Sequence, residues 1–585
     1  MKSFFKMVLA SFVGVLVAEI ILSVVVISFI VAVSSIFSSD TAPVTVQPNS
    51  IFRIMLDHPV AERAKSGQLE LGLTAVSMTR STGLNDILKN IRYAAADPHI
   101  NMVYLDLSEM QAGMAHVEEI RAALETFKES GKPVIAYGDN YTQSAYYLAT
   151  VADKIYLNPF GDAALTGLSA EVTFYKGLLD KLQVELQIVR HGKFKSAVEP
   201  FILDKMSDEN REQYLTFIHS VWDYRLEKIC AARQIDREKI HALIDNLELL
   251  TAQDALKNGL VDALLYKDEL LDKLCELSGA TSEKELEIID MEDYTRAARK
   301  QTAGRQRIAV VYADGEITMG KGETDITAWN FANTLRALRH DDAIKAVVFR
   351  VNSPGGSAQA SEIIARELSL LKEKKPVVVS MSNYAASGGY WISAPADKII
   401  VNPTSITGSI GVFGIIPNVK KGLNNHLGIT ADEAKSNTSA DYPSVMRPMT
   451  AREREATQAT VEFIYSQFID KIAQARDLPA AQVDAIGQGR IWSGIDAVKL
   501  GLADELGGIT EAVSAASELA GVENYRLIEL PAEKTPLEQI LESLTNGSIA
   551  VKTQAPEQIQ TMEYFLRQIT EPGIYARLPY DITVK

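Results

Sequence analysis

The stretch ADKIYLNP at residues 152–159 returns as ADKIIVNP at residues 396–403, which is 244 residues further along the chain. A second match supports the first, because Lys-Pro, Asn-Tyr and a serine recur in the same order and end at Ser144 and Ser387, 243 residues apart. A period this long indicates a duplicated domain, since the repeats of solenoid proteins are only tens of residues long. We therefore expect two copies of one fold, and differences between the copies should mark functional residues.

Each copy alternates short apolar strands with helices. The first copy predicts strands at 51–56, 102–107 and 134–137 and a helix at 116–128, and the second predicts strands at 308–312, 346–351 and 377–380 and a helix at 358–371. Strands that alternate with helices of this length are typical of α/β folds with mainly parallel sheets.

The N-terminal segment predicts a membrane anchor. Residues 8–33 are almost entirely apolar, and these 26 residues exceed the roughly 20 needed to span a bilayer. Lys2 and Lys6 precede the segment, so the positive-inside rule places the N-terminus in the cytoplasm and the remainder outside. A cleaved signal peptide would have an apolar core of only about 7–15 residues. Glu19 lies in mid-span, where an ionised carboxylate is costly, and we assign it no function.

These patterns divide the 585 residues into seven segments. They are a cytoplasmic N-terminus (1–7), the anchor (8–33), a linker (34–50), the first copy (51–290), a second linker (291–307), the second copy (308–530) and a C-terminal tail (531–585) that has no counterpart in the first copy.

Composition excludes several classes of function. The net charge of −16 argues against a general nucleic-acid binder, because a polyanion requires a basic surface. The two cysteines, Cys230 and Cys275, belong to no CxxC, HExxH or Cys/His cluster, which argues against a structural zinc or zincin site. The pair either forms a disulfide or remains as two thiols, and the sequence leaves both open.

Two glycine motifs occur only in the second copy. SPGGS at 353–357 follows one expected strand, and SGGY at 387–390 follows the next, where the first copy reads EMQA at 109–112 and SAYY at 144–147. Ser387 then lies at a strand-to-helix junction, where backbone N–H groups favour negative charge. Alone it would more often be a helix-capping serine. Gly355 and Gly356 can present unobstructed N–H groups to an oxyanion, and two such loops together favour chemistry over a turn.

A nucleophilic serine requires a base. None of the eight histidines follows Ser387 closely, and the first one downstream is His426. A Ser-His-Asp triad is not excluded, because triads are recognised by geometry rather than order. The first copy offers Lys195, which has no counterpart pattern in the second copy. A lysine acts as a base only if burial lowers its pKa, and taken alone Lys195 would more often be a solvated surface charge.

Four motifs together closely resemble the signal peptide peptidase A family in its long, duplicated form, the protease IV type. They are GKFKSAVEPF at 192–201, SPGG at 353–356, YAASGGY at 384–390 and TGSIG at 407–411. The resemblance extends in order from residue 51 to about residue 531 and includes the N-terminal anchor.

The resemblance implies a fold and a set of roles. The fold would be a tandem pair of crotonase/Clp-like ββα spiral domains behind one transmembrane helix. Ser387 would be the nucleophile and Lys195 the general base, with Ser409 orienting the lysine. N–H groups around Gly355 and Gly356 would form the oxyanion hole, and Ser144 would be inert. The resemblance implies no cofactor and no metal.

The resemblance also implies an assembly and a location. The family assembles as a bowl-shaped homotetramer at the bacterial inner membrane, with its catalytic domains on the periplasmic side, and degrades signal peptides left in the membrane. The first hypothesis is therefore a serine endopeptidase that cuts apolar peptides. An acyl-CoA enzyme on the same fold and a non-catalytic membrane scaffold are the alternatives, and fold alone does not separate them.

Overall fold

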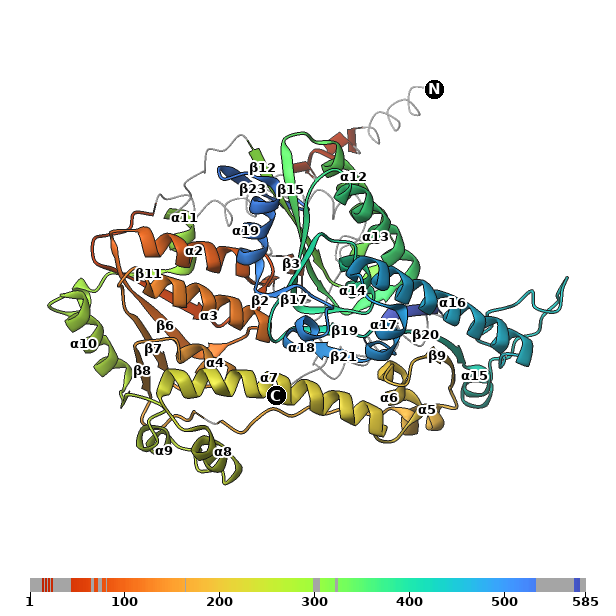
Figure 1. Ribbon diagram of the computed structural model, residues 1–585, viewed down its shortest axis with the longest axis horizontal. Helices are drawn as coiled ribbons and strands as arrows, with labels where there is room; N and C mark the ends of the chain where they lie inside the picture. The colour runs from red at the N-terminus through yellow and green to blue at the C-terminus, as the bar shows by residue number, and fades with distance from the viewer. Residues whose placement is uncertain are drawn as a thin grey trace.

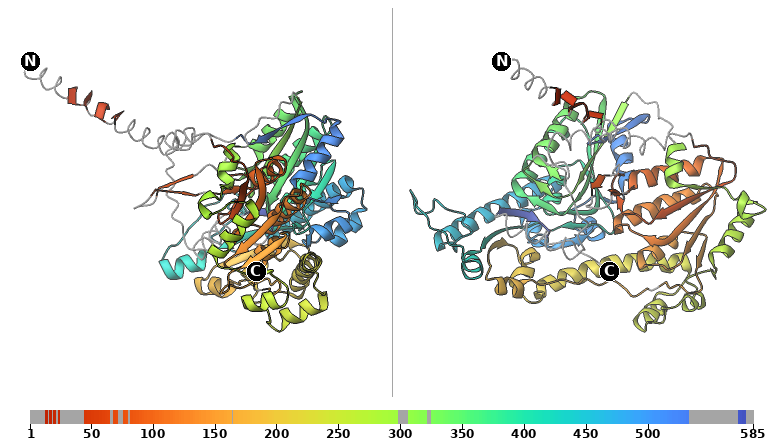
Figure 2. Two further views of the ribbon diagram at one scale, coloured as in Figure 1. Left: turned by 90° about the vertical axis from the view of Figure 1, so that its left-hand side faces the viewer. Right: turned by 180° about the vertical axis from the view of Figure 1, so that it is seen from behind.

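The computed structural model describes residues 13–14, 16–17, 19–21, 23–24, 44–64, 68–71, 76–79, 81–163, 165–297, 306–320, 325–532 and 573–578. Two α/β units lie side by side, the first copy in red-orange to yellow-green and the second in green to blue (Figures 1 and 2). The expected anchor at 8–33 falls largely outside the described residues. Within the described part of the chain, no helix has both the length and the hydropathy required to cross a membrane.

The first copy is built on a parallel sheet in the order β10-β8-β7-β6-β1-β11. Its central strands are buried runs of aliphatic and aromatic residues, as expected for parallel strands covered on both faces. The bounds are β1 Ser50–Leu56, β6 Ile100–Met110, β7 Val134–Gly138, β8 Lys154–Leu157, β10 Ala263–Leu264 and β11 Ile288–Asp290. The expected strands of this copy are confirmed.

The second copy repeats this sheet in the order β22-β18-β17-β15-β12-β23, again parallel throughout. It then adds β19, parallel to the end of β17, and β21, antiparallel to β19. The bounds are β12 Gln306–Asp314, β15 Ile344–Ser353, β17 Val377–Ala386, β18 Lys398–Val401, β19 Ile406–Gly408, β21 Ile491–Ser493, β22 Glu505–Leu506 and β23 Tyr525–Leu530. Strand β17 is longer than expected, because it continues to the residue before Ser387.

The helices also occur in corresponding pairs. The pairs are α2 Leu84–Ala96 with α12 Ala328–His340, α3 Met114–Lys128 with α13 Ala358–Lys372, α4 Gln143–Ala149 with α14 Gly388–Ser393, α5 Lys176–Leu182 with α15 Lys420–Leu427, α7 Asp208–Arg233 with α16 Ala451–Arg476, α8 Arg237–Asp245 with α17 Ala480–Ile486, α9 Ala252–Lys257 with α18 Gly494–Lys499, and α10 Lys267–Ser278 with α19 Ile509–Ala520. Helices α7 and α16 are both 26 residues long and both end in a left-handed residue. The duplication therefore holds at the level of whole elements.

A third sheet joins the two copies and was not predicted. Its order is β14-β13-β16-β24-β20-β9. Strand β9 comes from the first copy, β24 from the C-terminal tail and the others from the second copy. The bounds are β9 Glu185–His191, β13 Ile317–Thr318, β14 Ile326–Thr327, β16 Gly355–Ser357, β20 Val412–Asn418 and β24 Gly573–Arg577.

Helix α7 also crosses between the copies and runs along the lower edge of Figure 1. Its residues Tyr214, Phe217 and Val221 pack in one apolar cluster with Ala386 and Ile406 of the second copy. Burial of side chains of this size contributes roughly 1.5–3 kcal/mol each. The end of β17 is thereby fixed against an element of the first copy.

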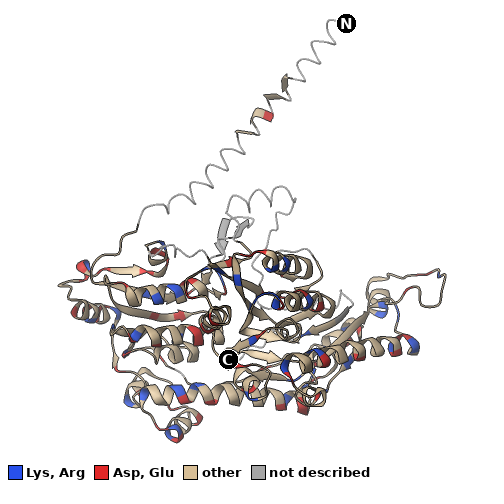
Figure 3. Cartoon of the chain, turned by 45° about the horizontal axis from the view of Figure 1, so that its top comes forward, with Lys and Arg blue, Asp and Glu red and all other residues tan. Residues whose placement is uncertain are grey.

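The structure also shows the state of the two cysteines and the distribution of the charged residues. Cys230 and Cys275 are free thiols, so the disulfide alternative is not realised. Charged residues of both signs are interspersed along the helices in Figure 3.

Candidate active site

Ser387 occupies a strained position between β17 and α14. Its φ of 55° and ψ of −113° are rare for a residue with a side chain, and its N–H donates to the Gly408 carbonyl at 2.8 Å. The side chain makes no helix-capping hydrogen bond, so Ser387 is not an ordinary capping serine. The backbone thus directs the hydroxyl away from the helix.

Lys195 reaches this hydroxyl because β9 and β20 pair in antiparallel register. The register places His191 opposite Val412, so the chain that leaves β9 passes directly beside the loop before β20. Lys195 Nζ lies 2.9 Å from Ser387 Oγ, and it also lies 3.0 Å from the Oγ and 3.1 Å from the carbonyl oxygen of Ser409. The structure therefore brings together the three side chains that were predicted from distant parts of the sequence.

Lys195 is buried together with Ser387. The Lys195 residue is 1% exposed and Ser387 is 0% exposed, and the lysine side chain lies near the Phe413 ring. Burial lowers the pKa of the Lys195 ammonium well below its usual value, because a charged amine loses its hydration there. The neutral amine that a general base requires is therefore favoured.

The segment that carries Lys195 is held by helix α7. Gln213 donates to the Phe194 carbonyl at 3.1 Å and to Ser196 Oγ at 2.9 Å, the residues on either side of the lysine. Glu199 accepts from Asn210 on the same helix at 2.9 Å. Sequence reasoning missed Gln213 and Asn210, because polar residues on a long helix carry no signal that they will be buried.

The glycine loop lies against the start of α14. Gly355 has a φ of +104°, and its Cα is 3.2 Å from the position that a Cβ would take on Gly388. A Cβ on Gly356 would lie 2.1 Å from the Ile317 carbonyl oxygen, so the close approach of β13 requires a glycine there. Gly388 opens α14, where backbone N–H groups have no partner within the helix. The expected oxyanion residues Gly355 and Gly356 are thus placed beside a further candidate donor, the Gly388 N–H.

A buried charge cluster beneath this site joins the copies. Arg350 on β15 donates to Glu62 at 2.7 Å and to Glu119 at 2.7 Å, and it is 0% exposed. Burial opposes ionisation of Glu62, but Arg350 and His116 outweigh it and lower the pKa of this carboxyl. His116 in turn lies 3.0 Å from Asn383 on β17. These residues were not predicted, because the two carboxylates and the arginine come from different copies.

The corresponding place in the first copy holds no such arrangement. Ser144 lies inside the first turn of α4, and its hydroxyl accepts from Arg225 at 3.2 Å. Thr142 caps that helix in the ordinary way. Ser144 therefore faces an arginine, which is not a base.

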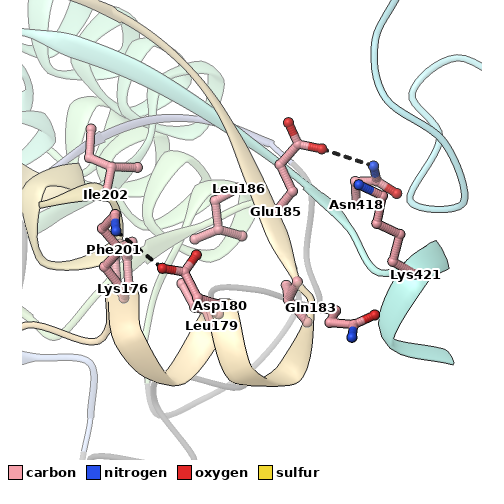
Figure 4. Close-up of a pocket in the computed structure, with 11 residues that line it drawn as sticks. Lys176, Leu179, Asp180, Gln183, Glu185, Leu186, Phe201, Ile202, Asn418 and Lys421 are labelled. Carbon is pink, nitrogen blue, oxygen red and sulfur yellow. Dashed lines mark hydrogen bonds and ion pairs between the residues drawn. The ribbon is translucent and has the colours of Figure 1, made fainter. Parts of the chain in front are cut away.

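Two hollows of the structure lie away from Ser387 and Lys195. One of about 550 Å³ is bounded by α5, β9 and α15, where Lys176 pairs with Asp180, and Asn418 donates to Glu185 (Figure 4). Neither this hollow nor a second one beside α7 includes Ser387 or Lys195 in its lining.

A buried serine with a lysine amine at hydrogen-bond distance, beside a glycine loop on a duplicated α/β scaffold, is the arrangement of a serine hydrolase. Comparison with known proteins specifies the class. The model of peptidase family S49 matches residues 126–281 and 369–523, one match in each copy, and the Clp protease model matches residues 299–406.

Relatives agree with this assignment over most of the chain. Protease 4 from Salmonella typhi is 39% identical over 526 residues, which cover 87% of this chain and 83% of the relative. Protease 4 from Haemophilus influenzae is 37% identical, with 76% and 74% covered, and the chloroplastic serine protease SPPA of Arabidopsis thaliana is 30% identical, with 91% and 78% covered. A ClpP1 mutant from Listeria monocytogenes is 17% identical with a TM-score of 0.24, covering 35% of this chain and 94% of that one. The chain belongs to peptidase family S49 and is a serine protease of that family.

Proposed function

We propose that the chain is a membrane-anchored serine endopeptidase that uses a Ser387/Lys195 dyad to degrade cleaved signal peptides and other apolar peptides. The observation that carries this proposal is the distance of 2.9 Å between Lys195 Nζ and Ser387 Oγ, both of which belong to buried residues. The burial that lowers the lysine pKa supports the same assignment.

In the first half of the reaction, the neutral Lys195 amine takes the proton of Ser387 Oγ as this oxygen attacks the peptide carbonyl carbon. The negative charge that develops on the carbonyl oxygen is stabilised by backbone N–H groups of the loop at Gly355 and Gly356 and by that of Gly388. The C–N bond then breaks, the lysine ammonium gives its proton to the leaving amine, and an acyl-serine remains.

In the second half, Lys195 takes a proton from water as the water oxygen attacks the acyl carbon. The tetrahedral intermediate collapses, and the lysine returns the proton to Ser387 Oγ. Ser409 positions the lysine throughout, because its Oγ and carbonyl oxygen both lie within about hydrogen-bond distance of Nζ.

The setting of the reaction follows from the sequence. The apolar segment 8–33 would anchor the chain in a bacterial inner membrane, with tandem crotonase/Clp-like domains on the periplasmic side, and a homotetramer would enclose the sites. Peptides left in the bilayer are apolar, so an anchored protease meets them at the membrane. Membership in family S49 favours proteolysis over the acyl-CoA and scaffold alternatives.

A serine-directed acylating probe tests the proposal. The probe should modify Ser387, mapped by mass spectrometry of the digested protein, and Ser387→Ala should remove the modification. Ser144→Ala is the matched control, because this serine occupies the same place in the first copy, and it should leave labelling unchanged. Modification of Ser144, or of any serine other than Ser387, would contradict the proposed dyad.

A further inference from the structure

The C-terminal tail contributes a strand to the third sheet, directly beside the catalytic residues. Strand β24 lies between β16 and β20 and is antiparallel to both. On one side Gly356 pairs with Ala576 and Gly355 with Arg577, and on the other Phe413 pairs with Tyr575. The tail has no counterpart in the first copy, so the duplicated scaffold does not account for this strand.

Strand β24 places a backbone carbonyl beside Gly355 and Gly388, the residues proposed above to stabilise an oxyanion. The Ala576 carbonyl oxygen lies 2.3 Å from the position that a Cβ would take on Gly355 and 3.0 Å from that on Gly388. Only glycine permits this approach. The N–H of Leu578 also donates to the Pro354 carbonyl at 2.7 Å, which continues the pairing beyond the strand. The tail thus enters the glycine loop that would stabilise an oxyanion.

The same strand closes the site. Ala576 and Ser387 are each 0% exposed. Without β24, the edges of β16 and β20 would present unpaired N–H and C=O groups to each other across the width of one strand. Such edges bind an extended peptide by main-chain hydrogen bonds, a recognition mode that tolerates many sequences.

We infer that β24 occupies the substrate position as an internal competitor, so that an extended peptide must displace the tail before it reaches Ser387. This inference rests on the proposed function of the site.

Two contacts hold the competitor in place. Arg577 pairs with Glu316 at 2.6 Å, and the ring of Tyr575 lies 5.9 Å from that of Phe413. Because the strand belongs to the same chain, it binds without recruiting a second molecule. If the open form, in which β24 has left the site, is only a small fraction of the molecules, the observed rate falls to that fraction of the rate of a fully open enzyme.

The test compares full-length variants by the rate at which the acylating probe labels Ser387. Ala576→Asp introduces a charge at a fully buried position in the tail, and Arg577→Ala removes the ion pair with Glu316. Arg526→Ala on the exposed surface of β23 is the control for loss of an arginine. Labelling should accelerate about tenfold in Ala576→Asp and about threefold in Arg577→Ala, because each change enlarges the open population. The control should label at the original rate, and a synthetic peptide of residues 573–578 should slow the Ala576→Asp variant again.

Unchanged labelling rates in both tail variants, with Ser387 still modified, would overturn the inference and leave the proposed function standing. Slower labelling together with a lower thermal midpoint would also overturn it, because β24 would then be a permanent part of the site. Absence of labelling at Ser387 in every variant would instead overturn the proposed function, on which the inference rests.

Discussion

The two copies share their sheets and helices but differ in the segments that follow α5 and α15. In the first copy the chain after α5 forms β9 and then carries Lys195. In the second copy the corresponding residues 428–450 contain no helix or strand and are largely exposed. Conversely, the chain after β18 forms β19 and β20, whereas residues 165–174 of the first copy contain only an isolated bridge.

The two copies therefore share the scaffold, but each forms strands in a different one of these two segments. The antiparallel pairing of β9 with β20 joins the two segments and sets Lys195 beside Ser387. Neither copy holds both groups, so the proposed dyad lies at the junction between the copies rather than within either repeat.

The largest effect is expected from removing either side chain of the proposed dyad, Ser387 from the second copy or Lys195 from the first. Ser387→Ala and Lys195→Ala should each lower kcat/KM for an apolar peptide by at least about 10³-fold, because members of a catalytic unit fail together. Ser144→Ala and Lys193→Ala, the latter at an exposed lysine two residues away, should change little. The dyad would be contradicted if either the Ser387→Ala or the Lys195→Ala protein folded and retained most of its activity.

The buried cluster of Arg350, Glu62 and Glu119 tests whether contacts between the two copies also stabilise the fold. Arg350→Met should lower the free energy of unfolding by about 3–5 kcal/mol, because Glu62 and Glu119 then remain buried without their cation. Thermal unfolding measures the change. The corresponding position in the first copy is Asp106, which pairs with the half-exposed Lys267. Lys267→Met should leave the midpoint nearly unchanged, and an equal loss in both variants would show that burial between the copies is not what matters.

The glycine loop is present in one copy only, which allows a narrower test. Gly355→Ala should lower kcat by about 10²–10³-fold, as loss of an oxyanion donor does, because a Cβ there would lie 2.8 Å from the Gly388 nitrogen, whose N–H is a proposed donor. Gly131→Ala is the matched control, since Gly131 has a similar φ of +80° but open space around it. Steady-state kinetics of the two variants separate the effects. An equal loss of activity in both variants would mean that the left-handed backbone conformation matters, and not the position of Gly355 beside Ser387.

The scaffold could be predicted from the sequence because parallel strands and their helices are local patterns that recur 243–244 residues apart. Ser387 and the glycine loop could be found because they differ from the first copy. The third sheet could not be predicted, since the pairing of β9 with β20 joins residues more than 200 positions apart and leaves no periodic signal. For the same reason Lys195 was identified from a family resemblance and not from its spacing, and Gln213, Glu62 and Arg350 were missed.

The pH dependence is the smallest expected effect and the one that tests the lysine most directly. The folded pKa of Lys195 is lowered by burial, and a general base acts only in its neutral form. Activity should therefore be constant above this pKa and fall about tenfold for each pH unit below it, because the neutral fraction falls in that proportion. A profile of kcat/KM measured on the full chain gives the position of the inflection. If the inflection instead fell near the ordinary lysine value, the amine would be solvated in the working enzyme, and the burial of Lys195 between the copies would not be the source of its basicity.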